Sequence, residues 1–409
     1  MSFQGPQINK RQGGLGRQNP STDGVFLIIG VIATAALSAT TVVHNKAYPL
    51  YQEQDAKDLG INESLDANNN ILVFQQISEF YRIAPESTLY FMPVAPATPL
   101  AILNLEAVKA EIRSFKDIKG IGIIGTEEAV SELEPLIEDL QEWVDDLAAE
   151  KRLIDFIILE GKGEEVPLAI SAYPNLRELN APNVHISIAQ DPAVAVLDTA
   201  YAKYADVGCV LGGLSVRSVN ESLGSVDILR KPSSRAGEQT YPISTNGKFL
   251  KASLSDGKAF DSLGITNQKL LTQKGYIYAG SFEGFDGVYF NGMPGCVELA
   301  SDYAWGENNR VWNKAARLVR QRTIPKIRGI LKKDPATGYL TASSAAAIEE
   351  VAKGALDTML KAEEISGFGV YVNAKQIVND QSPLKMKINV VRDEILHELE
   401  IDLGYSATV

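Results

Sequence analysis

Few residues in the sequence have the types and spacing that catalysis requires. Glu298 and Asp302 are four residues apart, so on a helix their carboxylates would share one face and could divide acid and base roles. Surface carboxylates at that spacing are common, however. The nucleophile motif GxSxG is missed at GLSVR, where Arg217 replaces the last glycine, and HELEI lacks the second histidine of a zinc-binding HExxH motif. We therefore predict that the protein is not an enzyme.

Cofactor and metal motifs are also missing. A dinucleotide-binding fingerprint follows a strand and opens a helix, whereas the glycines of GGLGR, residues 13–17, precede the first strand-like segment. No GxxxxGK[ST] motif occurs, and the few thiols and imidazoles lack the spacing of a metal site (Cys209, Cys296, His44, His185 and His397). We expect no cofactor and no metal, and we expect His185, inside an apolar strand, to be packed in the core.

An apolar stretch near the N-terminus allows two interpretations. Residues 25–43 are 19 residues without a charge, enough to span a bilayer, and ALSA resembles a signal-peptide cleavage site. In that alternative the chain is an exported α/β ligand-binding protein or enzyme with residues 1–39 as the signal peptide. In the other interpretation, the polar residues 1–23 form an extended arm, and GVFLIIG, residues 24–30, is a buried strand bounded by glycines.

Strand-like and helix-like segments alternate from about residue 70. The pattern predicts strands at residues 87–95, 118–126, 153–161 and 183–191, and helices at residues 103–115, 127–152 and 193–205. This alternation predicts the α/β fold class, with a multi-layer core around a largely parallel sheet. In the helix at 127–152, Pro135 should interrupt the apolar stripe, and the other face is acidic and should be a solvated outer face.

The sequence pattern changes after residue 220, where a loop-rich connector begins. Helices are expected from residue 310 to near Pro325 and at residues 341–365, and strands at residues 384–392 and 397–405. This makes the C-terminal part α+β, so that the chain is α+β overall. We predict four segments: an arm at 1–23, the α/β core at 24–220, the connector at 221–290 and a C-terminal domain at 291–409.

A run of basic residues favours a partner surface. The chain has 39 Lys and Arg against 51 Asp and Glu, a net charge of -12, which disfavours nucleic acid as its main partner. Yet nine cations and no acid occur within 24 residues: Arg310, Lys314, Arg317, Arg320, Arg322, Lys326, Arg328, Lys332 and Lys333. The first three recur at i, i+4 and i+7, so on a helix they share a face and repel one another, and we expect an acidic group to oppose them.

Both ends of the chain could form strands. Leu399, Ile401 and Leu403 alternate with Glu400 and Asp402, so a strand at residues 397–405 would have one apolar face. A chain with such strands at its ends is suited to lend them to neighbouring subunits. The alternative is a hairpin that closes the chain's own sheet.

The C-terminal third resembles the tail-sheath proteins of contractile phage tails and related contractile injection systems. The resemblance is carried by AFDSLGITNQKLLTQKGYIYAGSFEGFDGVYFN, by ENNRVWNKAARLVRQRTIPKI and by AEEISGFGVYVNAKQIVNDQSPLKMKINVVRDEILHELEIDLGY. The opening GGLGRQNPSTDGVFLIIG also looks like the start of one branch of the family. The resemblance implies a structural subunit that polymerises as stacked hexameric rings around an inner tube and contracts to drive the tube through a target envelope.

The resemblance also implies site residues and partners. The N-terminal arm and the C-terminal strand would reach into adjacent subunits through Ile8, Gly13, Gly14, Leu15, Gly16, Arg17, Leu399, Ile401 and Leu403. The tube-facing basic helix would present Arg310, Lys314, Arg317 and Arg320. The partners would be other copies, the inner tube protein, and baseplate and tail-terminator proteins, with no nucleic acid and no membrane insertion. The subunit would belong to a virion tail or to an injection particle assembled in the cytoplasm, without secretion through a signal peptide.

Overall fold

A computed structural model describes residues 23–405, which fold into two compact units. Unit 1 comprises the chain to residue 218 together with residues 223–306, and unit 2 comprises residues 219–222 and the chain from residue 307 onward. The division after residue 306 lies further along the chain than the expected start of a C-terminal domain at residue 291. The expected connector at 221–290 belongs to unit 1 except for its first two residues.

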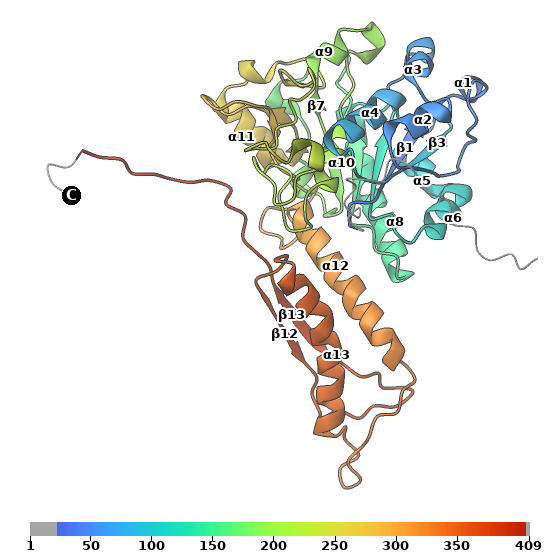
Figure 1. Cartoon of the computed structure of the whole chain (residues 1–409), viewed down its shortest axis with the longest axis vertical. Coiled ribbons are helices and arrows are strands. Elements are labelled where there is room, and N and C mark those ends of the chain that lie inside the picture. The colour runs from blue at the N-terminus through green and yellow to red at the C-terminus, as the bar shows by residue number, and fades with distance from the viewer. Residues whose placement is uncertain (1–22, 406–409) are drawn as a thin grey trace, which may run out of the picture. The chain divides into compact units, whose positions relative to one another are not determined.

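Unit 1 is built around a seven-stranded sheet, shown in Figure 1, with the strand order β2-β3-β1-β4-β5-β6-β9. The strands are β1 (Phe26–Val31), β2 (Tyr48–Leu50), β3 (Leu89–Val94), β4 (Gly120–Ile124), β5 (Phe156–Glu160), β6 (Val184–Ser187) and β9 (Tyr276–Ile277). All pairs are parallel except β2 with β3. The short apolar segments predicted from the sequence form the buried middle of this sheet, and the α/β fold class is confirmed.

The first half of the N-terminal apolar stretch is an interior strand of the sheet in unit 1. All six residues of β1 are buried, and the strand pairs with β3 on one side and with β4 on the other. The second half of the stretch contains only the short helix α1 (Thr34–Leu37). Among residues 23–405, no helix is long and apolar enough to cross a membrane.

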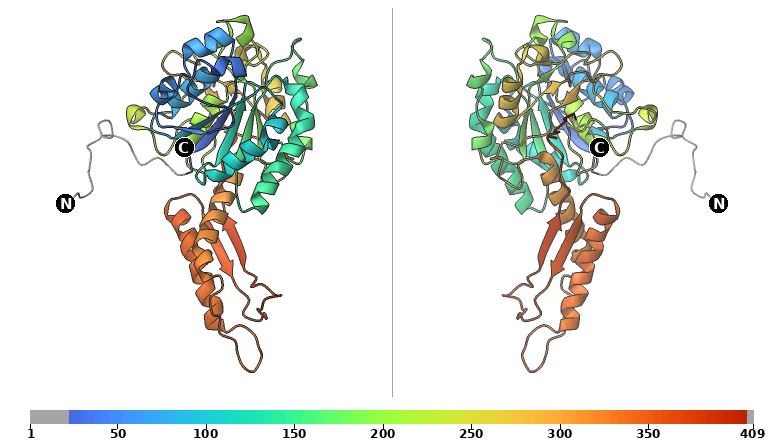
Figure 2. Two further views of the ribbon diagram at one scale, coloured as in Figure 1. Left: turned by 90° about the vertical axis from the view of Figure 1, so that its right-hand side faces the viewer. Right: turned by 90° about the vertical axis from the view of Figure 1, so that its left-hand side faces the viewer.

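Helices cover both faces of the sheet (Figure 2). One face carries α4 (Val73–Ile83) and α10 (Gly208–Ser215), and the other carries α6 (Glu106–Ser114) and α8 (Ile137–Ala149). The remaining helices of this region are α2 (Glu53–Asp58), α3 (Glu63–Asn69), α5 (Pro99–Asn104), α7 (Val130–Leu133) and α9 (Pro192–Ala195). Helices alternating with parallel strands give the three layers that the sequence pattern predicts.

The structure differs from the expected helices in two places. The expected helix at 193–205 is wrong, because only α9 and a 3-10 turn (Thr199–Tyr201) form there. Helix α10 was not predicted, because its glycines disfavour helix in isolation. They serve close packing instead: a side chain at Gly208 would meet the Gln76 carbonyl oxygen on α4 at 1.9 Å. Pro135 does interrupt the helix before α8, within the 3-10 turn Glu134–Leu136.

Short elements complete unit 1. They are the pairs β7 (Ala189–Gln190) with β8 (Ser253–Leu254) and β10 (Ala279–Gly280) with β11 (Tyr289–Phe290), the helix α11 (Ile265–Lys274), and 3-10 turns at Ile170–Ala172, Leu176–Glu178, Ser233–Arg235 and Phe260–Ser262. After β11, Glu298 lies in irregular chain and Asp302 in a turn, so neither is on a helix. The helical pairing considered for these two carboxylates is therefore wrong.

Unit 2 contains two long helices and one hairpin. The helices are α12 (Gly306–Thr323) and α13 (Ala342–Lys361), and the hairpin joins β12 (Gly367–Tyr371) to β13 (Lys387–Val391) in antiparallel pairing. A 3-10 turn, Ile324–Lys326, follows α12. The core of this unit is small: it includes Val311, Leu356, Met359 and Ile365, with Phe368 of β12 packed against them. Residues 392–405 form no helix or strand, so the expected strand at 397–405 is unpaired in the described chain.

His185 lies in the core, as its apolar strand predicts. The side chain on β6 is fully buried, and Nδ1 lies 2.8 Å from the Pro294 carbonyl oxygen. Burial disfavours the charged imidazolium and lowers the pKa of His185 to about 4. The unfolded chain binds a proton at His185 near pH 6.5, whereas the folded chain binds it only near pH 4. The free energy of unfolding therefore falls as the pH is lowered from 6.5 toward 4.

Replacing His185 with leucine should flatten this pH dependence. The variant will be less stable than wild type at pH 7, because the Pro294 carbonyl loses its partner. Between pH 7 and pH 4.5, however, the wild type should lose about 2 kcal/mol more free energy of unfolding than His185→Leu. Urea unfolding at the two pH values measures the difference. Equal losses in both proteins would contradict the assignment.

Candidate assembly surfaces

The C-terminal segment exposes an apolar stripe. Leu399, Ile401 and Leu403 are 67%, 71% and 95% exposed, and the segment from residue 392 to 405 pairs with no strand of the described chain. The alternative interpretation, in which residues 397–405 form a hairpin that closes the chain's own sheet, is therefore wrong. An extended segment with one apolar face and open backbone groups has the chemistry of a strand that pairs with another sheet. The other residues assigned to linking arms, Ile8, Gly13, Gly14, Leu15, Gly16 and Arg17, lie outside the described residues.

The β12–β13 hairpin has open edges that could accept such a strand. It is a sheet of only two strands in the described chain, so each strand has one edge without a neighbour. Phe368, Val370 and Ile388 pack toward the core of unit 2, whereas Tyr371 and Val391 are 61% and 57% exposed. Two strands alone are marginally stable, and open edges accept further strands. The hairpin is thus a sheet to which strands of other chains could be added.

Helix α12 does not present the expected cationic face. Arg310 is fully buried, and the Lys314 ammonium pairs with the Glu364 carboxylate at 2.5 Å. The i, i+4, i+7 spacing does place these side chains together, but next to Val311 and Ala315, which face the core of unit 2. For Lys314, the expected acidic group therefore lies within the chain itself. Of the four residues assigned to this face, Arg317 is half-buried and Arg320 is exposed.

The exposed face of α12 includes a residue that the charge pattern does not reveal. Trp312 is 51% exposed, and Arg320 follows it two turns later, with the half-buried Ala316 between them. Tryptophan and arginine are both enriched in protein interfaces. The sequence did contain an indication that Trp312 is exposed, because Trp312 does not share the i, i+4 spacing of the buried residues Val311 and Ala315.

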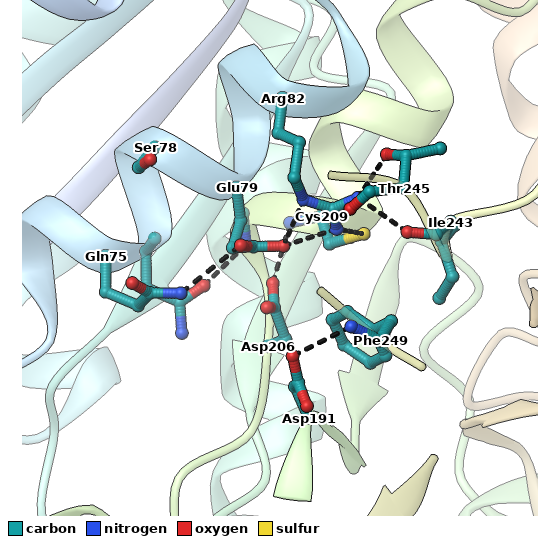
Figure 3. Close-up of polar contacts among 12 residues, drawn as sticks. Gln75, Ser78, Glu79, Arg82, Asp191, Asp206, Cys209, Ile243, Thr245 and Phe249 are labelled. Carbon is teal, nitrogen blue, oxygen red and sulfur yellow. Dashed lines mark hydrogen bonds and ion pairs between the residues drawn. The ribbon is translucent and has the colours of Figure 1, made fainter. Parts of the chain in front are cut away.

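A buried polar network connects segments of unit 1 that are distant in sequence (Figure 3). The Arg82 guanidinium on α4 donates to Glu79 Oε2 at 2.9 Å, to the Ile243 carbonyl at 2.5 Å and to Thr245 Oγ1 at 2.7 Å. Both charged side chains are almost fully buried, at 7% and 2% exposure. The network thereby fastens the loop at 243–245 to the α4 face of the sheet.

Acidic groups on α4 and at the start of α10 lie close to one another in the same network. Burial and the neighbouring Glu79 carboxylate raise the pKa of Asp206 well above its ordinary value. Asp206 Oδ1 accepts a hydrogen bond from the Cys209 backbone N–H at 2.7 Å, at the start of α10. Cys209 Sγ lies 3.6 Å from Arg82 Nη2, and burial raises the pKa of this thiol as well. A thiol held neutral is a poor nucleophile, so we assign the network to the support of the fold.

Comparisons with known proteins agree with the resemblance found in the sequence. The family model of the DUF2586 N-terminal domain matches residues 3–293, and that of the DUF2586 C-terminal domain matches residues 302–409. No curated protein matches the chain. The two matched ranges divide the chain near the boundary between unit 1 and unit 2.

Solved structures share the fold across nearly the whole chain. A chain of the anti-feeding prophage baseplate, 6-fold symmetrised, has a TM-score of 0.62 at 12% identity, covering 99% of both chains. The anti-feeding prophage helical sheath in its contracted state has a TM-score of 0.60 at 12% identity, covering 100% of this chain and 99% of that one. The sheath tail protein of Desulfitobacterium hafniense has a TM-score of 0.51 at 10% identity, covering 96% and 100%. The predicted resemblance to tail-sheath proteins is confirmed in the fold.

Removing the central cation of the buried network should be costly. We expect Arg82→Met to lower the free energy of unfolding by about 3–5 kcal/mol, because Glu79 would remain buried without its cation. Arg113→Met is the matched control. It breaks the ion pair of Arg113 with Glu150, in which the two side chains are 42% and 47% exposed, and it should change the free energy of unfolding little, because solvent screens exposed pairs. Urea unfolding compares the two variants. Similar small losses in both would show that the network does not support the fold.

Proposed function

The chain belongs to the DUF2586 family and has the fold of contractile tail-sheath proteins, and from this we propose that it is a structural sheath subunit. Subunits form six-fold rings that stack around an inner tube. The sheath is assembled in an extended, metastable state, and contraction into a wider and shorter lattice drives the tube through a target envelope. The role is structural, without a catalytic step.

The observation that carries this proposal is the apolar stripe of the C-terminal segment, which no strand of the described chain covers. Burial of the Leu399, Ile401 and Leu403 side chains in a neighbouring subunit would contribute several kcal/mol, at about 1.5–3 kcal/mol for each fully buried side chain. We propose the open edges of the β12–β13 hairpin as the acceptor. The N-terminal arm, including Ile8 to Arg17, joins neighbouring subunits in the same way.

Strand linkage suits a lattice that must change its geometry without falling apart. Hydrogen bonds between paired strands involve backbone groups only, so they persist while the flanking chain bends. The residues between β13 and the apolar stripe form no helix or strand, and they can absorb changes in backbone angle as hinge segments do. Subunits can therefore rotate and slide during contraction while the links between them remain intact.

The exposed face of α12 is proposed to contact the inner tube. Arg320 provides exposed positive charge there, the half-buried Arg317 lies at the edge of this face, and Trp312 provides an exposed aromatic surface. Arg310 and Lys314 are excluded from this role, because the first is buried and the second is paired with Glu364. Contacts between exposed charges weaken as the partners separate and as salt increases, which suits a grip that is released when the sheath widens.

The remaining partners are the proteins at the two ends of the sheath. We propose that the first and last rings bind baseplate and tail-terminator proteins, within a virion tail or a particle assembled in the cytoplasm. The alternative, an exported protein with residues 1–39 as a signal peptide, would remove β1 from the centre of the sheet. We therefore do not propose it.

Polar substitutions in the apolar stripe should block polymerisation. We expect Leu399→Asp with Ile401→Asp and Leu403→Asp to leave a folded monomer, because the stripe is exposed and does not support the fold of the subunit. The matched control replaces Glu400 and Asp402, on the other face of the strand, with alanine. Negative-stain electron microscopy and sedimentation compare both variants with wild type. Tubes or rings from the triple aspartate variant would refute strand linkage by this segment.

Reversing the charge of the exposed α12 face should abolish binding to the tube. Arg317→Glu with Arg320→Glu is expected to prevent co-assembly with the inner tube protein, since it places negative charge where the acidic tube binds. A control reversal at the exposed Lys361 of α13 should leave co-assembly intact. Co-sedimentation of tube and sheath at low and high salt is the measurement. Unchanged co-assembly of the double variant would exclude the α12 face as the tube contact.

A further inference from the structure

The loop that follows α12 presents a second group of cations, separate from the α12 face. Lys326, Arg328, Lys332 and Lys333 are all exposed, and residues 326–333 contain no acid. None of these four cations takes part in an ion pair with any residue of the described chain. Ile327 and Ile330, which lie among them, are 70% and 97% exposed. We call residues 326–333 the basic loop.

The basic loop has a defined backbone. Ser344 Oγ on α13 accepts a hydrogen bond from the Lys332 backbone N–H at 3.1 Å, and the Thr341 N–H donates to the Lys332 carbonyl at 3.1 Å. Lys333 forms an isolated bridge with Leu340. These contacts hold the second half of the loop against the start of α13. The cations near it are therefore presented from an ordered segment, which lowers the entropic cost of docking.

Helix α8 in unit 1 has the opposite character. Its exposed face carries Glu138, Asp139, Glu142, Asp145 and Asp146, and no Lys or Arg occurs between residues 130 and 149. Apart from Asp145, which accepts a hydrogen bond from Gln141, these carboxylates have no ion pair or side-chain hydrogen bond within residues 23–405. Like charges at i, i+4, such as Glu138 with Glu142, repel by a few tenths of a kcal/mol per pair.

The five exposed carboxylates of α8, which we call the acidic face, are held in position by the packing of the helix. On the opposite side of α8, Leu140, Val144 and Leu147 are buried, and the Trp143 indole N–H donates to the Leu103 carbonyl at 3.0 Å. The helix therefore cannot turn its carboxylates toward other residues of its own unit. A partner that neutralises them must approach from outside.

We propose that the basic loop of one subunit docks on the acidic face of α8 in a second copy of the chain. The inference rests on the proposed function, because it requires that the subunits polymerise. Each copy carries one basic loop and one acidic face, so the two surfaces occur in equal number throughout a polymer. A contact between two different surfaces of the same chain is heterologous, and such contacts repeat into rings or helical filaments rather than closing a pair. The exposed isoleucines of the loop would be covered by the same contact.

The test uses two full-length charge-reversal variants. The loop variant carries Lys326→Glu, Arg328→Glu, Lys332→Glu and Lys333→Glu, and the α8 variant carries Glu138→Lys, Asp139→Lys, Glu142→Lys and Asp146→Lys. Each variant alone brings like charges together at the contact, so at low salt its critical concentration for polymerisation should rise at least tenfold. An equal mixture restores the opposite charges between the two kinds of subunit, and its critical concentration should return to within about threefold of wild type.

Controls separate charge pairing from general damage. Lys251→Glu with Lys361→Glu changes exposed cations elsewhere and should polymerise as wild type does. Circular dichroism and thermal unfolding check that each variant is folded. If the mixture polymerises no better than the two variants alone, or if the α8 variant polymerises as wild type, the proposed docking is wrong. If the wild type forms no polymer under any salt condition, with or without the tube protein, the proposed function itself is refuted.

Discussion

Extended backbone can be buried only when its hydrogen-bonding groups are paired, and β1 and the C-terminal segment differ in whether the described chain provides that pairing. In unit 1, β1 is buried and pairs on both sides, so the hydrogen-bonding groups of this strand are paired within the subunit. At the C-terminus, the apolar residues of 397–405 are exposed and no strand of the described chain pairs with them. A segment of this kind is stabilised only by another chain. This incomplete pairing is the basis for the proposed assembly. It requires an acceptor, for which we propose the β12–β13 hairpin, and it links subunits through strands that allow them to move.

Unit 1, in contrast to the open C-terminal segment of unit 2, has a tightly packed interior. Gly208 allows α10 to approach α4 more closely than any side chain would permit, and the Arg82 network ties α4 to the loop at 243–245. Close packing and buried charged hydrogen bonds make such a body resistant to deformation. In the proposed contracting sheath, a rigid subunit would transmit force, because the displacement would be taken up in the links between subunits.

The basic run at residues 310–333 is divided between buried or paired side chains and exposed ones. Arg310 is buried and Lys314 is paired with Glu364, whereas the cations from Arg320 onward are exposed. The chain as a whole is acidic, so this acid-free group of cations has the opposite sign to the net charge. In the proposed assembly they would be matched by acidic surfaces of the tube and of other copies, and both proposed contacts would be sensitive to salt.

Local sequence patterns determined the alternating strands, the interruption at Pro135, the buried His185 and the apolar stripe of residues 397–405, because these depend on a side chain and its near neighbours. Patterns also placed Arg310, Lys314 and Arg317 on one helix face, but could not say which way that face points. Only the tertiary structure decided this, since Glu364, the partner of Lys314, lies 50 residues away. The same holds for α10, whose glycines oppose helix formation locally and are explained only by packing against α4. The direction in which a helix face points and the partner of a side chain depend on residues distant in sequence, so the spacing of residues along the chain cannot predict them.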